Sequence, residues 1–239
     1  MKILAVSDAE DNNLENAIKF HNDKLAGVDY IFSCGDLKRK YLEYVTDSVK
    51  KSLYFVMGNH FALQFYGDNF KTPKLVKKLY YGKGMRLRSG GIDMHGRVEI
   101  VENYIVAGFG GSMRYNPGTF QFEESEMERI VKRAKSEIKW QRFKDFIFFR
   151  KKKEIIVMSH APVAGIHDCQ DVCHSGFKCF RAFIHEMKPL LWLHGHIHIE
   201  GQRKEQNTIF EETLIVNAYS SKIIDIDENT ISLKQVYEL

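Results

Sequence analysis

The sequence predicts an α/β protein whose strands are largely parallel and joined by crossover helices. Short apolar runs alternate with segments of helical apolar spacing in the N-terminal part of the chain. Several of these runs end in Asp, Asn or His, and the carboxyl ends of parallel strands are where open α/β sheets build their sites. No repeat, low-complexity tract or linker interrupts the 239 residues, so we expect a single domain over residues 1–239.

The composition is that of an ordinary globular protein, with 44% hydrophobic and 28% charged residues. The net charge of +4 fits anionic substrates, but a lysine-rich solvated surface explains it more simply than a nucleic-acid track. No apolar run approaches membrane-spanning length, and the first one, residues 3–6, is too short for a secretion signal. We therefore expect a cytoplasmic protein with reduced cysteines and no membrane partner.

The N-terminal part of the sequence predicts three strands, each followed directly by a short polar segment. The strands are expected at residues 2–6, 30–33 and 53–57, with helices at residues 13–24 and 41–50. The polar ends are Ser7-Asp8-Ala9-Glu10, Cys34-Gly35-Asp36 and Gly58-Asn59-His60. Gly35 allows a tight backbone turn behind the carboxylate of Asp36.

The middle of the chain is less regular. Residues 82–91 are glycine-rich and basic, which favours loop and turn. Residues 98–101 and 104–107 predict strands of a β-meander with a turn at Asn103, followed by a flexible glycine loop at residues 108–112. Residues 123–150 predict a helix with an acidic start and a basic end. That basic end could touch nucleic acid, although a solvated helix end is the simpler explanation.

The C-terminal part returns to strong strands. An apolar run at residues 154–158 leads to His160, and another at residues 189–193 leads to His194-Gly195-His196-Ile197-His198. Between them lie a polar segment at residues 167–176 and a helix expected at residues 177–187. Closing strands are expected at residues 214–217, 223–227 and 231–236.

The strand-end residues carry a resemblance when they are set in chain order. They are Asp8-Ala9-Glu10, Gly35-Asp36, Gly58-Asn59-His60, His160 and Gly195-His196-Ile197-His198. Each fragment is weak alone, but the five in order resemble the motifs of calcineurin-like metallophosphoesterases. The sequence His-Ala-Pro…Gly-Ile-His-Asp…His-Ser-Gly, from His160 to Gly176, also resembles a bacterial branch of that family whose role is unsettled. The resemblance implies a four-layer αββα sandwich of two mixed β-sheets, and metal-dependent hydrolysis of a phosphate ester.

The resemblance also implies a site for two divalent metal ions. Asp36 would bridge both ions and take part in catalysis. Asp8, Glu10 and His198 would hold the first ion, and Asn59, His160 and His196 the second. His60 would stay unligated as a catalytic acid for the leaving group, which favours a phosphodiesterase over a monoesterase. Two neighbouring cations lower the pKa of a bridging water, so that the resulting hydroxide can attack phosphorus in line, and they neutralise charge on the phosphoryl oxygens.

Glu10 is a departure from the family pattern, which usually has His there. A carboxylate adds negative charge and hardens the site, which favours Mn²⁺, with Fe, Zn or Ni as alternatives. Glu10 could instead be a surface carboxylate after a turn, in which case Asp11 could take its place.

Four further residues are candidates for substrate binding. Arg114 follows the glycine loop and could clamp a phosphate bidentately, although a surface arginine is an equal alternative. His167, Asp168 and His174 could line the pocket. Cys169, Cys173 and Cys179 lie near these histidines, so a small zinc site is conceivable, but the spacing matches no common zinc module. His194 is expected to support a metal ligand or to lie in the core, rather than to bind a metal itself.

The leading hypothesis is therefore a phosphodiesterase acting on a phosphate-ester substrate such as a nucleotide, a cyclic nucleotide or a nucleic-acid end. A nuclease is the second enzyme hypothesis, and it predicts a basic groove around the site. A catalytically weak scaffold of the same fold is a third, supported only by Glu10. Substrate, native metal and oligomeric state do not follow from the sequence, since the loops that choose a substrate vary within one fold.

Overall fold

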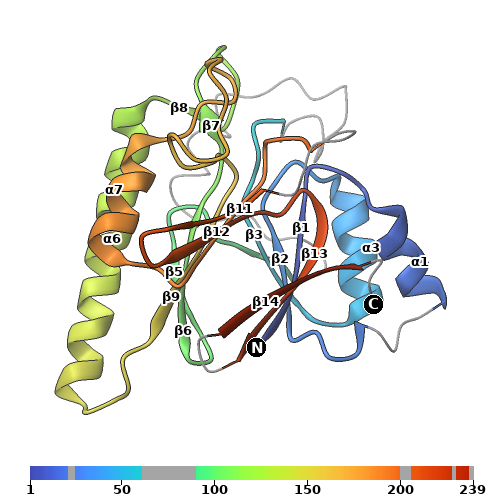
Figure 1. The fold of residues 1–239 in the computed structure, drawn as a ribbon, viewed down its shortest axis with the longest axis horizontal. Coiled ribbons are helices and arrows are strands. Elements are labelled where there is room, and N and C mark those ends of the chain that lie inside the picture. Colours follow the sequence, from blue (N-terminus) through green and yellow to red (C-terminus); the bar gives the residue numbers. More distant parts are fainter. Residues whose placement is uncertain (21–24, 61–89, 200–205, 228–229, 237–239) are drawn as a thin grey trace.

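Two six-stranded mixed β-sheets form the centre of the protein, which we describe from a computed structural model (Figure 1). The structure describes residues 1–20, 25–60, 90–199, 206–227 and 230–236. In the first sheet the order is β14-β13-β1-β2-β3-β4. Its strands are β1 (Lys2–Ser7), β2 (Tyr30–Ser33), β3 (Ser52–Phe55), β4 (Ile92–Asp93), β13 (Ser220–Asp227) and β14 (Thr230–Gln235). Strands β1 to β4 are parallel, and β13 and β14 are antiparallel to their neighbours.

The second sheet has the order β11-β12-β10-β9-β6-β5. Its strands are β5 (Val98–Val101), β6 (Tyr104–Phe109), β9 (Glu154–Ser159), β10 (Leu191–His194), β11 (Asn207–Phe210) and β12 (Thr213–Asn217). The four central strands are parallel, and each edge strand is antiparallel. A separate parallel pair joins β7 (Ser112–Met113) to β8 (Gln121–Phe122).

Helices cover the outer face of each sheet, so the expected four-layer αββα sandwich is confirmed (Figure 1). Helices α1 (Asn12–Phe20) and α3 (Arg39–Val49) lie beside the first sheet, and α6 (Glu124–Ile147) and α7 (Lys178–Met187) beside the second. Successive residues of a strand point to opposite faces of its sheet. Ile3 and Ile156 belong to the core between the two sheets, whereas Leu4 packs toward the helices. Strands covered on both faces are apolar throughout, which is why their runs are readable in the sequence.

Most expected elements are present, and the differences have local causes. The helix expected to reach residue 150 ends at Ile147, and Phe149 has a left-handed φ of 52°. The glycine loop begins later than expected, because β6 continues through Phe109. The meander is only a β5–β6 hairpin, since Ile92–Asp93 pairs with β3 in the other sheet. Strands β4, β7, β8 and β11 are additions to the expected set. The expectations for residues 21–24 and 82–89 lie outside the described residues.

Candidate metal centre

The turns after β1 and β2 place two aspartates at the carboxyl end of the first sheet. Asp8 and Asp36 both have left-handed backbones, with φ of 63° and 54°. Such a conformation is uncommon for a residue with a side chain, and it clusters at functional sites. Glycines make room for these side chains: a Cβ on Gly58 would lie 1.9 Å from Asp36 Oδ1, and one on Gly195 would lie 2.5 Å from Asp8 Oδ2.

Four of the predicted ligands, Asp36 and the three for the second ion, form one buried cluster. His160 Nε2 lies 2.8 Å from Asn59 Oδ1 and 3.3 Å from Asp36 Oδ2. The ring of His196 lies 4.7 Å from that of His160, measured between centroids. Asp36, His160 and His196 each offer a ligand atom within 4.8 Å of the others, and all three are buried. Residues from separate strand ends therefore converge as the sequence predicts.

The backbone fixes which nitrogen of His160 faces this cluster. His160 Nδ1 lies 2.8 Å from the carbonyl oxygen of Cys34, to which it donates, so Nε2 is left to face the carboxylate. Burial alone would lower the pKa of His160, but the Asp36 carboxylate outweighs it and raises the pKa to about 9. For Asp36 burial likewise opposes the shift, and His160 lowers the pKa of the carboxyl. The pocket thus favours a positive charge, as a cation site must.

Asp8 and His198, two of the predicted ligands for the first ion, lie close to each other. Asp8 Oδ2 accepts hydrogen bonds from the backbone N–H of His196, at 2.8 Å, and from the hydroxyl of Ser7. Asp8 Oδ1 is buried, and within the described ranges it has no hydrogen-bond partner. His198 Nε2 lies 3.7 Å from that oxygen. An orphaned buried carboxylate oxygen is costly, which a bound cation would offset, so the residues present fit a divalent metal.

The predicted ligand Glu10 forms an exposed ion pair. Its Oε1 lies 3.2 Å from Lys38 Nζ, and the side chain is 40% exposed. Asp11 does not offer a substitute, because it caps α1: its carboxylate accepts from the N–H of Asn13 at 2.8 Å and from the hydroxyl of Ser221. A role for Glu10 as a metal ligand stays a prediction.

His60 lies at the exposed rim of the cluster. Its backbone N–H donates to Asp36 Oδ1 at 3.0 Å, while the residue itself is exposed. The backbone therefore ties His60 to the predicted bridging carboxylate and leaves its ring accessible to a substrate.

Arg114 is engaged with the start of α6. Its Nη2 lies 2.6 Å from Glu126 Oε2 and 3.2 Å from the carbonyl oxygen of Gln121, and its Nη1 lies 3.7 Å from Glu123 Oε1. These contacts fasten the β7–β8 segment to the helix. A phosphate clamp at Arg114 stays a prediction, and this geometry favours a structural role.

The three other substrate candidates divide into two groups. Both ring nitrogens of His167 are used, at 2.8 Å from His194 Nε2 and 2.7 Å from Thr208 Oγ1. Burial lowers the pKa of His167 to about 4, so the ring is a neutral link between strands. Asp168 accepts from the N–H groups of Gly165 and Gly176 and thereby closes its own loop. The expectation that His194 faces away from the metal is consistent with its burial against His167.

His174 is the candidate that lies beside the cluster. Asp171 holds its Nδ1 at 2.8 Å, and its ring centroid lies 5.1 Å from that of His196. Cys173 lies there too, because its carbonyl oxygen is 2.7 Å from His196 Nε2. Of the three clustered cysteines only Cys173 joins a ligand group in the described part of the chain, so the conceivable three-cysteine zinc site is not assembled.

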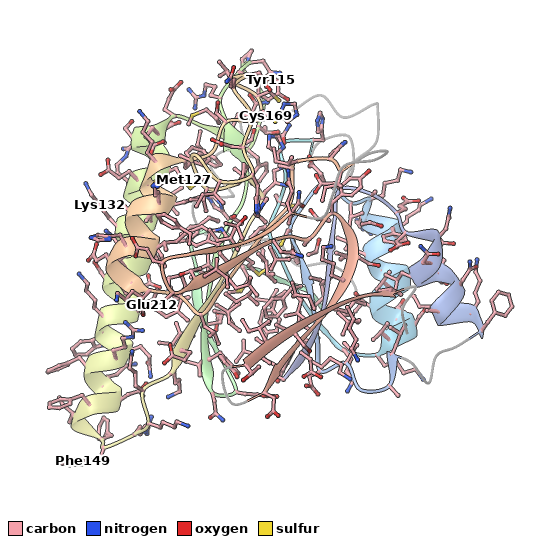
Figure 2. All side chains as sticks on the ribbon, in the orientation of Figure 1. Tyr115, Met127, Lys132, Phe149, Cys169 and Glu212 are labelled. Atoms are coloured by element: carbon pink, nitrogen blue, oxygen red, sulfur yellow. The ribbon has the colours of Figure 1, made fainter. Side chains whose placement is uncertain are left out.

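Tyr115 contacts the buried cluster directly, although it is not among the site residues proposed from the sequence. Its hydroxyl accepts a hydrogen bond from Asn59 Nδ2 at 3.0 Å, and it also interacts with the thiol of Cys173. Figure 2 shows Tyr115 and Cys169 at the same end of the molecule. Because Asn59 and Tyr115 are far apart in sequence, no local pattern could have revealed this contact.

Fold and site together define an α/β sandwich protein with candidate metal-ligating side chains at its strand ends. The sequence profile of calcineurin-like phosphoesterases matches residues 1–200. The chain belongs to the calcineurin-like phosphoesterase family. Membership supports a metal-dependent phosphoesterase in general terms. In the described residues, no helix is both long enough and apolar enough to span a bilayer.

Solved structures agree on the fold. The TT1561 protein of Thermus thermophilus is 14% identical, with a TM-score of 0.61 and coverage of 98% of each chain. A second crystal structure aligns with a TM-score of 0.60 at the same identity and coverage. A novel archaeal phosphodiesterase aligns at 13% identity, over 98% of this chain and 99% of that chain, with a TM-score of only 0.43. No curated protein shows significant sequence similarity to the chain. Likeness at these identities shows the fold alone.

Proposed function

We propose that the protein is a dinuclear-metal-dependent phosphodiesterase. The observation that carries the proposal is the buried Oδ1 of Asp8, which has no hydrogen-bond partner among the described residues and faces His198 next to the Asp36–His160–His196 cluster. Six of the seven predicted ligands lie in these two adjoining groups, and Asp8 joins them through the backbone of His196. Such convergence of oxygen and nitrogen donors is what two divalent cations require.

Asp36 would serve both ions, with Asp8, His198 and Glu10 on one side and Asn59, His160 and His196 on the other. Mn²⁺ suits this mixed set of carboxylates, an amide and imidazoles best. When bound, the two ions would supply an activated water and neutralise charge on the phosphoryl oxygens.

The protein's own groups orient this chemistry. The carbonyl of Cys34 holds His160 in one tautomer, and the N–H of His196 holds Asp8. The ring of His60 stands exposed at the rim, where it can donate a proton to the leaving oxygen. A diester's alkoxide leaving group needs that proton, so a phosphodiester is the substrate class that this arrangement favours. His174, held by Asp171, would form part of the pocket wall.

The ion pair of Glu10 with Lys38 is the one observation that favours a metal-poor scaffold instead. Metal content after reconstitution with Mn²⁺ tests both possibilities, for wild type, Glu10→Ala and the control Glu43→Ala, whose carboxylate pairs with Arg39. We expect two ions in wild type and the control, and one in Glu10→Ala. Hydrolysis of bis(p-nitrophenyl) phosphate should exceed that of p-nitrophenyl phosphate. Wild type without metal, or with metal but without diester hydrolysis, would contradict the proposal.

A further inference from the structure

The far end of α6 exposes an unusual group of large apolar side chains. We call Trp140, Phe143, Phe146, Ile147, Phe148 and Phe149 the aromatic tip. Phe149 is 98% exposed, Phe146 78% and Trp140 60%. Figure 1 shows this end of α6 projecting past the sheets, and Figure 2 places Phe149 at its extremity. Contiguous apolar surface of this kind marks an interaction site.

Helical geometry shows that the tip is not a continuation of the buried face. Met127, Val131, Ala134 and Ile138 are buried, which defines the face that packs on the protein. At 100° per residue, Trp140, Phe143 and Ile147 lie on the opposite face. In the first half of the helix that outer face carries Arg129, Arg133 and Ser136. The outer face thus changes from charged to aromatic only where the helix projects.

Basic residues border the tip. Residues 150–153 read Arg-Lys-Lys-Lys and, with Tyr104, line a cavity of about 480 Å³. Lys153 pairs with Asp145 at 3.0 Å and Lys152 with Glu154 at 3.9 Å, whereas Arg150 and Lys151 form no ion pair in the described ranges. The Arg150 guanidinium lies 5.4 Å from the centroid of the Phe148 ring. Cationic and aromatic surface are therefore continuous.

We propose that the aromatic tip docks the protein on an anionic lipid bilayer. Aromatic and aliphatic side chains enter the interface between headgroups and acyl chains, while Arg150 and Lys151 contact the lipid phosphates. Single-stranded nucleic acid also binds aromatic and basic residues, but along a groove, whereas these rings lie at the projecting end of a helix (Figure 1). The expectation of no membrane partner rested on the lack of an apolar run of spanning length, and this proposal of a peripheral contact departs from it.

Docking at this end leaves the metal centre open to water. Tyr115, which contacts Asn59, lies at the other end of the molecule from Phe149 (Figure 2). The 24-residue helix α6, which ends in the tip, is about 36 Å long. The lipid is therefore an anchor rather than the substrate, so the inference does not depend on the proposed function.

Trp140 supplies a direct test, because Trp192, the other of the two tryptophans, is fully buried. Vesicles of phosphatidylcholine with phosphatidylglycerol should bind the protein and shift its tryptophan emission to shorter wavelength. Trp140→Phe should abolish the shift while vesicle binding persists. Phe148→Ser with Phe149→Ser should weaken binding about tenfold, and Lys151→Gln about fivefold. The control Ile209→Ser changes a side chain that is 75% exposed elsewhere and should bind like wild type.

Circular dichroism will verify that the serine variants are folded, as expected for exposed positions. The proposal is overturned if wild type does not sediment with phosphatidylglycerol vesicles, or if the double serine variant binds them as wild type does. A dimer in analytical ultracentrifugation that the double serine variant loses, without vesicle binding, would assign the tip to a second copy. Binding of an oligonucleotide instead of vesicles would likewise overturn it.

Discussion

The buried Oδ1 of Asp8 lies 3.7 Å from Nε2 of His198, although 190 residues separate the two in the chain. The oxygen has no hydrogen-bond partner among the residues that the structure describes. A buried carboxylate oxygen without a hydrogen bond opposes folding, so its place here is explained by binding rather than by stability.

Asp8→Asn should therefore leave the metal-free protein at least as stable as wild type while removing its stabilisation by Mn²⁺. A ligand at a hundredfold excess over its Kd stabilises the folded state by about 2.7 kcal/mol, and this increment should be lost. Thermal unfolding with and without Mn²⁺ measures both effects. If the Asp8→Asn variant unfolds at a lower temperature than wild type but is stabilised by Mn²⁺ to the same extent, Asp8 has a structural role.

Tyr115→Phe should weaken metal binding without unfolding the protein. The hydroxyl accepts the hydrogen bond of Asn59 Nδ2 and so turns the amide oxygen toward His160. Loss of such a supporting contact typically lowers metal affinity by about 10- to 100-fold. Competition with a chelating indicator gives the affinity. Tyr54→Phe, in the first sheet, is the matched control, and equal affinity in both variants would refute this role of Tyr115.

Arg114→Ala separates the two roles considered for that residue. Because the guanidinium contacts Glu126 and the carbonyl of Gln121 and is one-third exposed, we expect a loss of about 1 kcal/mol in the free energy of unfolding. The KM for a phosphodiester should stay near the wild-type value. Urea unfolding and steady-state kinetics test this against Arg129→Ala. A KM raised tenfold at unchanged stability would instead support the role of Arg114 as a phosphate clamp.

His95 should make the protein less stable in acid. Burial lowers the pKa of His95 to about 4, and its Nδ1 accepts the N–H of Gly110 at 2.9 Å. An unfolded chain has a histidine pKa near 6.5, so it binds the proton first as the pH falls. The contribution of His95 to stability is therefore nearly full above pH 6.5, and it declines by about 3 kcal/mol as the pH falls to 4.

His95→Asn keeps an acceptor for Gly110 but cannot take up a proton. Unfolding in urea across this pH range should show a shallower decline for the variant than for wild type. His185→Asn, at an exposed histidine, is the control. Parallel pH profiles for His95→Asn and wild type would show that His95 does not contribute.

The sequence by itself determined most of the strands and the polar residues that follow them. Apolar runs such as residues 154–158 can be recognised as strands in the sequence, because strands covered on both faces are apolar throughout. Parallel strands bring their carboxyl ends to one edge of a sheet, so Asp8, Asp36 and Asn59 are predictable as site residues from local patterns alone. The four layers followed from resemblance and were confirmed by the two sheets and their helices.

Only the tertiary structure decided how the side chains around that edge pair. Tyr115 reaches Asn59, Glu10 turns to Lys38, and Arg114 binds Glu126. The exposure of the aromatic tip was decided in the same way, because α6 runs past the sheet that it covers. Periodicity reports the environment of a residue on its own strand or helix. Contacts between segments that are far apart in the chain depend instead on how the two sheets and their covering helices pack together. No local sequence pattern encodes that packing.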